Sequence, residues 1–287
     1  MLKESLIGLS LVLVIVIALS VVSMFAKTSH LSEAQEMIDN PRWTLIWSDE
    51  FDGDEINTDK WRFDLGNRNG WGNAELQYYT EGKNVELADG VLIIEARKED
   101  MSEADRVYNY TSSRLKTESR FSVQYGRIEA RIKFPYGKGL WSAFWMLGDN
   151  FRYVGWPMCG EIDIVEFLGH DRWTVYGTIH GPGYSSSRGI SGEFRKDQGQ
   201  LPSFTEDFHT FGIIWNDEEI VWYVNDSICH RVTRAALEDK DNLWVFDREF
   251  FIILNLAVGG YWPGYPDLGT PFPAEMHVDY VRVYQLQ

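Results

Sequence analysis

From residue 43 onward, this chain of 287 residues consists of short segments rich in Val, Ile, Phe, Tyr and Trp. Turn-forming pairs such as Asp52-Gly53 and Asn69-Gly70 separate them. In residues 127–133 charged and apolar side chains alternate, so one face of a strand would be wet and the other buried. The pattern predicts an all-β sandwich of antiparallel sheets, and no βαβ spacing favours a parallel fold. Clear strand segments are residues 90–96, 125–132, 211–215 and 220–224.

No linker or repeat interrupts residues 41–287, and a single β-sandwich reaches this size. We therefore expect one domain there. Within it, only residues 232–241 resemble a short helix. Residues 27–40 are polar and end at Pro41, which predicts a lead-in with at most one short helix.

The first 26 residues form a targeting segment. Lys3 and Glu4 precede an uncharged run over residues 5–26, and Lys27 ends it. The run is longer than most signal-peptide cores and approaches the roughly 20 residues that span a bilayer. A cleaved signal peptide and an uncleaved membrane anchor both fit, and both place the domain outside the cytoplasm. We expect a secreted or cell-envelope-anchored protein that touches a membrane only through residues 5–26.

The formal net charge of −16 argues against binding to nucleic acid, whose phosphates attract Lys and Arg. The 12 Trp, 14 Tyr and 16 Phe residues exceed the needs of a core of this size and suggest exposed rings that stack on sugars. A neutral polysaccharide partner fits both observations, and we expect the protein to act as a monomer. Cys159 and Cys229 are the only cysteines, so either one disulfide or two buried thiols are expected.

Three acids lie in an otherwise apolar strand segment, Gly160 to Phe167. In a regular strand, Glu161 and Asp163 would share one face and Glu166 would point to the other. One extra residue between Asp163 and Glu166, a β-bulge, would bring all three acids to one face. The segment therefore predicts a bulge if the acids act together.

Two neighbouring carboxyl groups about 5 to 5.5 Å apart suit a retaining glycosidase, in which one attacks the anomeric carbon and the other protonates the leaving oxygen. Crowding of like charges would keep one of the acids protonated near neutral pH. Two other interpretations of the same cluster are a solvated strand face and a calcium site.

The segment 160–169, GEIDIVEFLG, resembles the signature of glycoside hydrolase family 16, in its laminarinase-type branch. The resemblance covers about residues 43 to 286. It implies a β-jelly-roll sandwich of the concanavalin A-like kind, with a concave substrate cleft. Further matching stretches are WSDEF (47–51), GNAELQYY (72–79), GLWSAFWMLG (139–148), TIHG (178–181), LNLAVGG (254–260) and VDYVRVY (278–284).

By this resemblance Glu161 is the nucleophile, Asp163 the helper carboxylate and Glu166 the acid/base, with no cofactor needed for catalysis. The spacing between Asp163 and Glu166 is that of β-1,3-glucanases, with some action on β-1,3-1,4-glucan compatible. Alternatives are a non-catalytic glucan-binding protein and a hydrolase of a red-algal galactan, agarose or carrageenan. The resemblance also implies substrate contacts by Asn73, Arg114, Trp141, Trp145, His180 and Trp262.

The family often holds a structural calcium ion on the convex side. The resemblance places it here at the Asp279 side chain and backbone, together with the backbone carbonyls of Glu50 and Gly90. Oxygen ligands of this kind suit calcium. Such an ion would be structural and take no part in catalysis.

Overall fold

A computed structural model of the chain describes residues 36–38, 40, 42–197, 202–238 and 242–287. The chain divides into two units, residues 1–41 and 42–287. Residues 1–26, for which a targeting segment is expected, lie outside the described residues, and of the lead-in only residues 36–38, which are helical, and residue 40 are described. None of the helices in the described ranges is long and apolar enough to cross a membrane.

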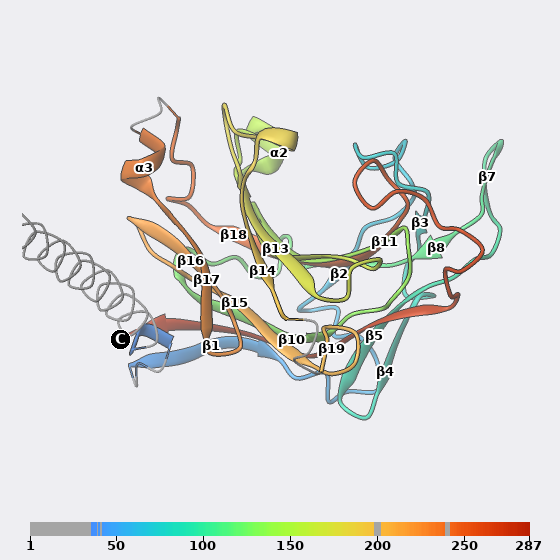
Figure 1. Cartoon of the computed structure of the whole chain (residues 1–287), viewed down its shortest axis with the longest axis horizontal. Coiled ribbons are helices and arrows are strands. Elements are labelled where there is room, and N and C mark those ends of the chain that lie inside the picture. The colour runs from blue at the N-terminus through green and yellow to red at the C-terminus, as the bar shows by residue number, and fades with distance from the viewer. Residues whose placement is uncertain (1–35, 39, 41, 198–201, 239–241) are drawn as a thin grey trace, which may run out of the picture. The chain divides into compact units, whose positions relative to one another are not determined.

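Two antiparallel sheets form the unit of residues 42–287 and lie over each other as two layers (Figure 1). The larger, eight-stranded sheet runs in the order β17 (Ser227–Thr233), β16 (Glu219–Val224), β15 (His209–Trp215), β10 (Gly126–Lys133), β19 (Ala274–Leu286), β5 (Val91–Ala96) and β4 (Val85–Ala88), with β1 (Trp43–Asp49) also paired to β19. The seven-stranded sheet runs in the order β14 (Ile190–Arg195), β13 (Thr174–His180), β12 (Glu161–Leu168), β11 (Leu140–Gly148), β18 (Phe250–Val258), β9 (Arg114–Lys116) and β2 (Arg62–Phe63).

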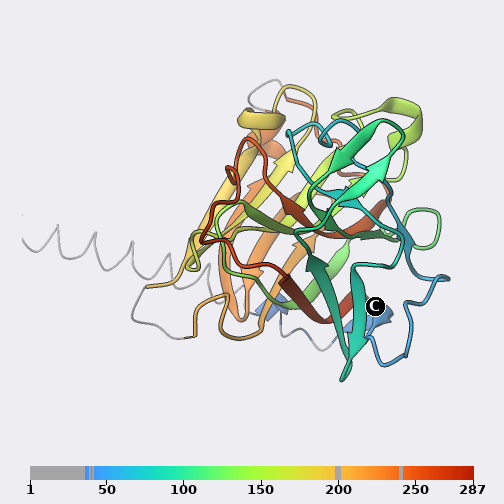
Figure 2. The same ribbon diagram turned by 90° about the vertical axis from the view of Figure 1, so that its right-hand side faces the viewer.

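The remaining elements are short and lie in the connections between these strands. A second view of the molecule shows these connections (Figure 2). The helical segments are α2 (Phe151–Val154), the 3₁₀ turn η1 (Ser186–Arg188) and α3 (Arg234–Glu238), and the added strand pairs are β3 (Tyr78–Tyr79) with β8 (Thr111–Ser112) and β6 (Met101–Glu103) with β7 (Arg106–Tyr108). The all-β prediction is confirmed. The helix expected over residues 232–241 begins at Arg234, because β17 continues to Thr233, and residues 239–241 lie outside the described residues.

Alternation along the strands places the core between the two sheets. In β5 every second residue, beginning at Leu92, is buried, and the residues between them are partly exposed. In the middle of the core, Phe134 stacks on Phe167 of β12 with 4.6 Å between ring centroids. The apolar side of β12 is therefore fixed by packing against the opposite sheet, and its other side is left for polar groups.

Cys159 and Cys229 are both free thiols, so the structure supports the second of the two expectations for them. Cys159 is buried and Cys229 is partly buried. Burial raises the pKa of the Cys159 thiol to about 11 and that of Cys229 to about 12. Both groups are therefore protonated near neutral pH and contribute to packing.

Candidate active site

The predicted bulge is present in β12. Next to β13, Asp163 pairs with Thr178 and Glu166 pairs with Tyr176, so two residues of β12 face one residue of β13. Next to β11, Phe144 pairs with Val165 and Trp145 pairs with Asp163, which shows the same extra residue. The bulge resets the alternation of side chains after Asp163.

The neighbouring strands show that the three acids share one face. Glu161, Asp163 and Glu166 lie opposite Leu147, Trp145 and Ala143 of β11, which are alternate residues of a regular strand. On the other side of β12, the same three acids pair in register with His180, Thr178 and Tyr176 of β13. The intervening residues Phe144, Met146, Ile162 and Ile179 belong to the core. We call the side of the seven-stranded sheet that carries the three acids the acid face.

His180 lies between two of the acids. Its Nε2 atom is 3.3 Å from Asp163 Oδ2 and 3.6 Å from Glu161 Oε1. The ring fits there because position 189 is a glycine, where an added Cβ atom would lie 2.3 Å from His180 Cε1. Glu161, Asp163 and His180 are also the one set of three potential metal ligands found among the described residues. Their polar atoms lie within 4.8 Å of one another, so the set is dense enough to hold a proton or a cation.

Two tryptophans donate hydrogen bonds to the glutamates. Trp156 Nε1 donates to Glu161 Oε2 at 2.9 Å, and Trp141 Nε1 donates to Glu166 Oε1 at 3.1 Å. Each indole N–H fixes one oxygen of a carboxyl group and leaves the other oxygen free of that bond. Asp163 and Glu166 are buried, with 3% and 8% of their surface exposed. The two glutamates are therefore oriented by neutral donors, and Glu161 is the more exposed of the two.

Burial is the largest cause of the shifted pKa values in this cluster. It raises the pKa of Glu161 to about 8, and the charge of Asp163 acts in the same direction. Burial also raises the pKa of Asp163, and it raises that of Glu166, to which the charges of Asp163 and Glu161 add. His180, the Trp156 hydrogen bond and the Arg114 guanidinium favour the ionised form of Glu161. His180 and the Trp141 hydrogen bond also favour the ionised form of Glu166. The two glutamates differ because two carboxylate charges raise the pKa of Glu166, whereas one raises that of Glu161 and the Arg114 guanidinium opposes it.

A strand with two glutamates on one face and a bulge between them is a specific arrangement, and the sequence comparison agrees with it. The sequence model of glycosyl hydrolases family 16 matches residues 67–282. The chain belongs to glycosyl hydrolase family 16.

Relatives within family 16 are similar over most of the chain. A beta-glucanase of Rhodothermus marinus is 43% identical over 254 residues, covering 85% of this chain and 86% of that protein. The solved endo-beta-1,3-glucanase of Pyrococcus furiosus is 56% identical, with a TM-score of 0.84, covering 85% of this chain and 95% of its own. The laminarinase catalytic domain of Thermotoga maritima is 51% identical, with a TM-score of 0.83, and the match covers 85% of this chain and 99% of that domain's chain. The sandwich is therefore the jelly roll of the family 16 laminarinases.

The predicted sugar-binding residues lie around the acids. The Arg114 guanidinium lies over the rings of Trp71, Tyr79 and Trp145, with 4.6 Å, 5.1 Å and 5.2 Å to their centroids. The Trp145 indole N–H is used by Asn255, since its Nε1 atom donates to Asn255 Oδ1 at 2.7 Å. This group of rings and guanidinium lies on the Glu161 side of the site, as the charge interaction between Arg114 and Glu161 indicates.

Asn73 and Trp262 are linked through the loop that follows β18. The Asn73 carbonyl accepts a hydrogen bond from the Tyr261 backbone N–H at 2.9 Å, and the Asn73 side chain donates to Glu75 Oε1 at 3.3 Å. The Trp262 ring meets Trp141 and Tyr176 edge to face, with centroids 5.6 Å and 5.1 Å apart. Trp262 therefore lies beside the indole that binds Glu166.

The sequence argument missed Trp156 and Tyr176. Trp156 lies in the loop between β11 and β12, five residues before Glu161, and this closeness in sequence was the available signal. Tyr176 shares its strand face with His180, which alternation along β13 indicates.

The residues proposed for calcium lie on the other sheet. Asp279 is in β19, between the stretch paired with β1, which begins at Val281, and the stretch paired with β5, which ends at Val278. The ends of β1 and β5 next to this point lead to Glu50 and Gly90. The Asp279 Oδ2 atom accepts a hydrogen bond from Arg131 Nη1 at 2.6 Å. The strand register brings the three positions together, and an ion there would share the Asp279 carboxylate with Arg131.

The raised pKa of Glu161 predicts how stability depends on pH. The folded-state pKa of about 8 lies above the model value of 4.5, so the folded state holds this proton more tightly than the unfolded chain. The resulting stabilisation is complete below the unfolded-state pKa and is lost as pH rises through the folded-state pKa. At pH values above 8, Glu161→Gln should therefore have a higher melting temperature than wild type. Near pH 4 the two proteins should have similar melting temperatures.

Thermal unfolding followed by circular dichroism across this pH range measures the effect. Glu55→Gln, which changes an exposed glutamate, is the matched control and should show no such trend. An equal difference between Glu161→Gln and wild type at every pH would contradict the linkage.

Proposed function

We propose that this family 16 chain is a retaining endo-β-1,3-glucanase that hydrolyses laminarin-like polysaccharides. The observation that carries the proposal is the bulge in β12, because it brings Glu161 and Glu166 to the acid face beside each other. The names of the similar proteins, a beta-glucanase, an endo-beta-1,3-glucanase and a laminarinase, support the substrate class. The exposed rings near the acids suit a neutral sugar chain.

In the first chemical step, a Glu161 carboxylate oxygen attacks the anomeric carbon while Glu166 gives its proton to the glycosidic oxygen. The bond between the anomeric carbon and that oxygen breaks, and the departing sugar leaves with a new hydroxyl group. Ionised Glu166 then takes a proton from water, whose oxygen displaces Glu161 from the anomeric carbon. Two inversions give net retention, and Glu166 is protonated again at the end.

The surroundings fit these two roles. Trp156 and His180 contact Glu161 and favour its charged form, as a nucleophile requires. The charges of Asp163 and Glu161 raise the pKa of Glu166, as a proton donor requires. Once Glu161 is bonded to sugar, its charge is gone and the pKa of Glu166 falls, which suits its second role as a base.

Two further points concern the substrate range and the choice between hydrolysis and binding alone. Activity on mixed β-1,3-1,4-glucan is compatible with the site and is a secondary activity in this proposal. A silent glucan-binding protein would not need three clustered acids with raised pKa values, so the acids favour hydrolysis over binding alone.

Variants of the two glutamates test the assignment. Glu166→Gln should lower the release of reducing ends from laminarin by roughly 10²–10⁴-fold, the usual contribution of general acid–base catalysis. Glu161→Gln should remove hydrolysis but leave laminarin binding intact, because no ring contact is changed. Glu86→Gln, an exposed glutamate on the eight-stranded sheet, is the control and should keep wild-type activity.

The stereochemistry and substrate range are measured with the wild-type enzyme. Proton NMR of the first product should show the β anomer, and products should be most abundant from laminarin in a panel that includes lichenan, agarose and carrageenan. Surviving activity of Glu161→Gln, or an α anomer as the first product, would sink the assignment.

We propose that Asp279, Glu50 and Gly90 bind a structural calcium ion, with the side-chain oxygens of Asp279 and backbone carbonyls as hard ligands. Added Ca²⁺ should then raise the melting temperature, since a ligand that binds only the folded state stabilises it by about 2.7 kcal/mol at 100 times its Kd. EDTA should reverse the rise. Asp279→Asn should abolish it, and Asp267→Asn, a loop aspartate paired with Lys138, should retain it. A Ca²⁺ response that is unchanged in Asp279→Asn would exclude this site.

The uncharged run over residues 5–26 supports a further proposal, that the chain is exported and either cleaved or anchored. Expression of the full chain in a secreting host, followed by intact mass measurement, distinguishes the two forms. Cleavage predicts protein in the culture medium that lacks about the first 20 residues, and anchoring predicts full-length protein in the membrane fraction. Full-length protein in the cytosol would contradict export. That the protein acts as a monomer stays a prediction.

A further inference from the structure

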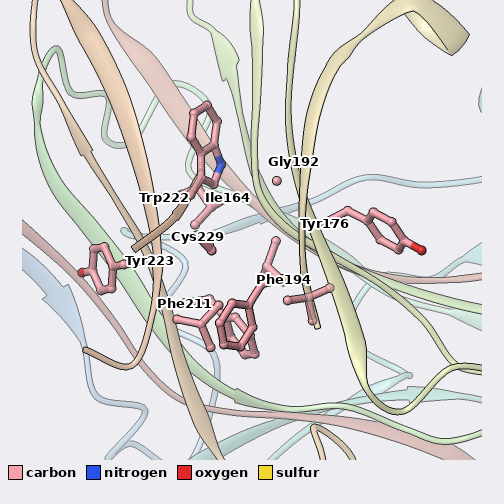
Figure 3. Close-up of a pocket in the computed structure, with 12 residues that line it drawn as sticks. Ile164, Tyr176, Gly192, Phe194, Phe211, Trp222, Tyr223 and Cys229 are labelled. Carbon is pink, nitrogen blue, oxygen red and sulfur yellow. The ribbon is translucent and has the colours of Figure 1, made fainter. Parts of the chain in front are cut away.

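The Trp222 side chain connects the two sheets at the bulge. Trp222 lies in β16 of the eight-stranded sheet and is 1% exposed. Its Nε1–H donates a hydrogen bond of 2.8 Å to the backbone carbonyl of Asp163, a residue of the seven-stranded sheet. Figure 3 shows Trp222 in the interior beside Ile164, the first residue after Asp163. A polar bond thus crosses the apolar core and ends on the middle acid of the site.

The position of this carbonyl matters because regular pairing with β13 stops there. Asp163 pairs with Thr178, and pairing resumes only at Glu166 with Tyr176. The hydrogen-bond ladder is disrupted at a bulge, so the backbone depends on other contacts to stay in one conformation. Trp222 supplies such a contact at the last regular pair before the bulge.

The strands around Trp222 are shaped to hold its ring in this position. Gly177, the β13 residue opposite the bulge, leaves room for the indole, since a Cβ atom there would lie 2.4 Å from Trp222 Cδ1 and 2.7 Å from Nε1. On β17, the His230 ring packs against the indole with 4.9 Å between centroids. The ring is therefore confined from two sides, and its N–H has a fixed direction.

We propose that Trp222 is a positioning residue for catalysis, which holds the β12 bulge so that Glu166 stays on the acid face with Glu161. This inference rests on the proposed glucanase function. Trp222 touches neither substrate nor the carboxyl groups, and acts through the backbone between Asp163 and Glu166. Without this tie the extra residue can shift along β12, and a shift of one residue turns a side chain to the other face of the sheet.

A purely structural role for Trp222 is the competing explanation, and the chain offers a matched control. Trp215 lies on the adjacent strand β15, is also 1% exposed, and donates from Nε1 to the Phe246 carbonyl at 3.0 Å. Trp215→Phe and Trp222→Phe each remove one buried indole N–H bond and keep an aromatic ring. Their effects on stability should be alike, while only Trp222 is bonded to the segment that carries the acids.

The test compares wild type, Trp222→Phe and Trp215→Phe by kcat, KM, pH profile and melting temperature on a soluble laminarin oligosaccharide. Trp222→Phe should lower kcat by about tenfold to a hundredfold, the effect of misplacing a catalytic group by about 1 Å. KM should stay close to wild type because Arg114 and Trp262 are not affected. The alkaline limb of its pH profile should move to lower pH, because Glu166 separates from the other carboxylates. Trp215→Phe should lose melting temperature only.

A second pair of variants covers the case in which Trp222→Phe does not fold. Gly177→Ala pushes on the Trp222 ring and should reproduce the loss of kcat. Its control is Gly212→Ala, in which the new Cβ atom would lie 2.3 Å from Tyr223 Cζ and away from the acids.

Wild-type kcat and pH profile in Trp222→Phe or Gly177→Ala would overturn the proposal, as would equal losses of kcat in variant and control. Inactive wild-type enzyme would instead contradict the proposed function itself.

Discussion

Side chains on a β-strand alternate between its two faces, and this constraint decides what β12 can do. The apolar residues of β12 must face the opposite sheet, where Phe167 stacks on Phe134. Without an extra residue, Glu166 would share that apolar side, where a carboxyl group has no water and few partners. The bulge resolves the conflict by turning Glu166 outward and keeping Phe167 inward. One inserted residue thus serves both the packing of the core and the assembly of the acids.

The acids are close together at a considerable electrostatic cost, and the surrounding residues determine how each one responds. Burial raises the pKa of all three. His180, Trp156 and Arg114 offset part of this effect at Glu161. His180 acts on Glu166 in the same direction, so the two glutamates differ mainly in the Arg114 guanidinium of β9 near Glu161 and in the second carboxylate charge near Glu166.

The sequence was a good guide where structure depends on local alternation. Strand segments, the antiparallel sandwich and the bulge between Asp163 and Glu166 follow from residue spacing along the strands. It was a poor guide to contacts between distant segments. Trp222 and Asp163 are 59 residues apart, and nothing in either strand indicates that an indole from one sheet bonds a backbone carbonyl of the other. The end of β17 at Thr233, after which the expected helix begins, is likewise set by pairing with β16.

The register between β11 and β12 has one more consequence. Along β11, the residues that face the acids are Trp141, Ala143, Trp145 and Leu147, and the smallest of them, Ala143, lies directly opposite Glu166. The smallest side chain of the row therefore lies next to the proton donor, between the positions of two indole rings. The pairing that gathers the acids on one face thus also decides which side chains of β11 border each acid.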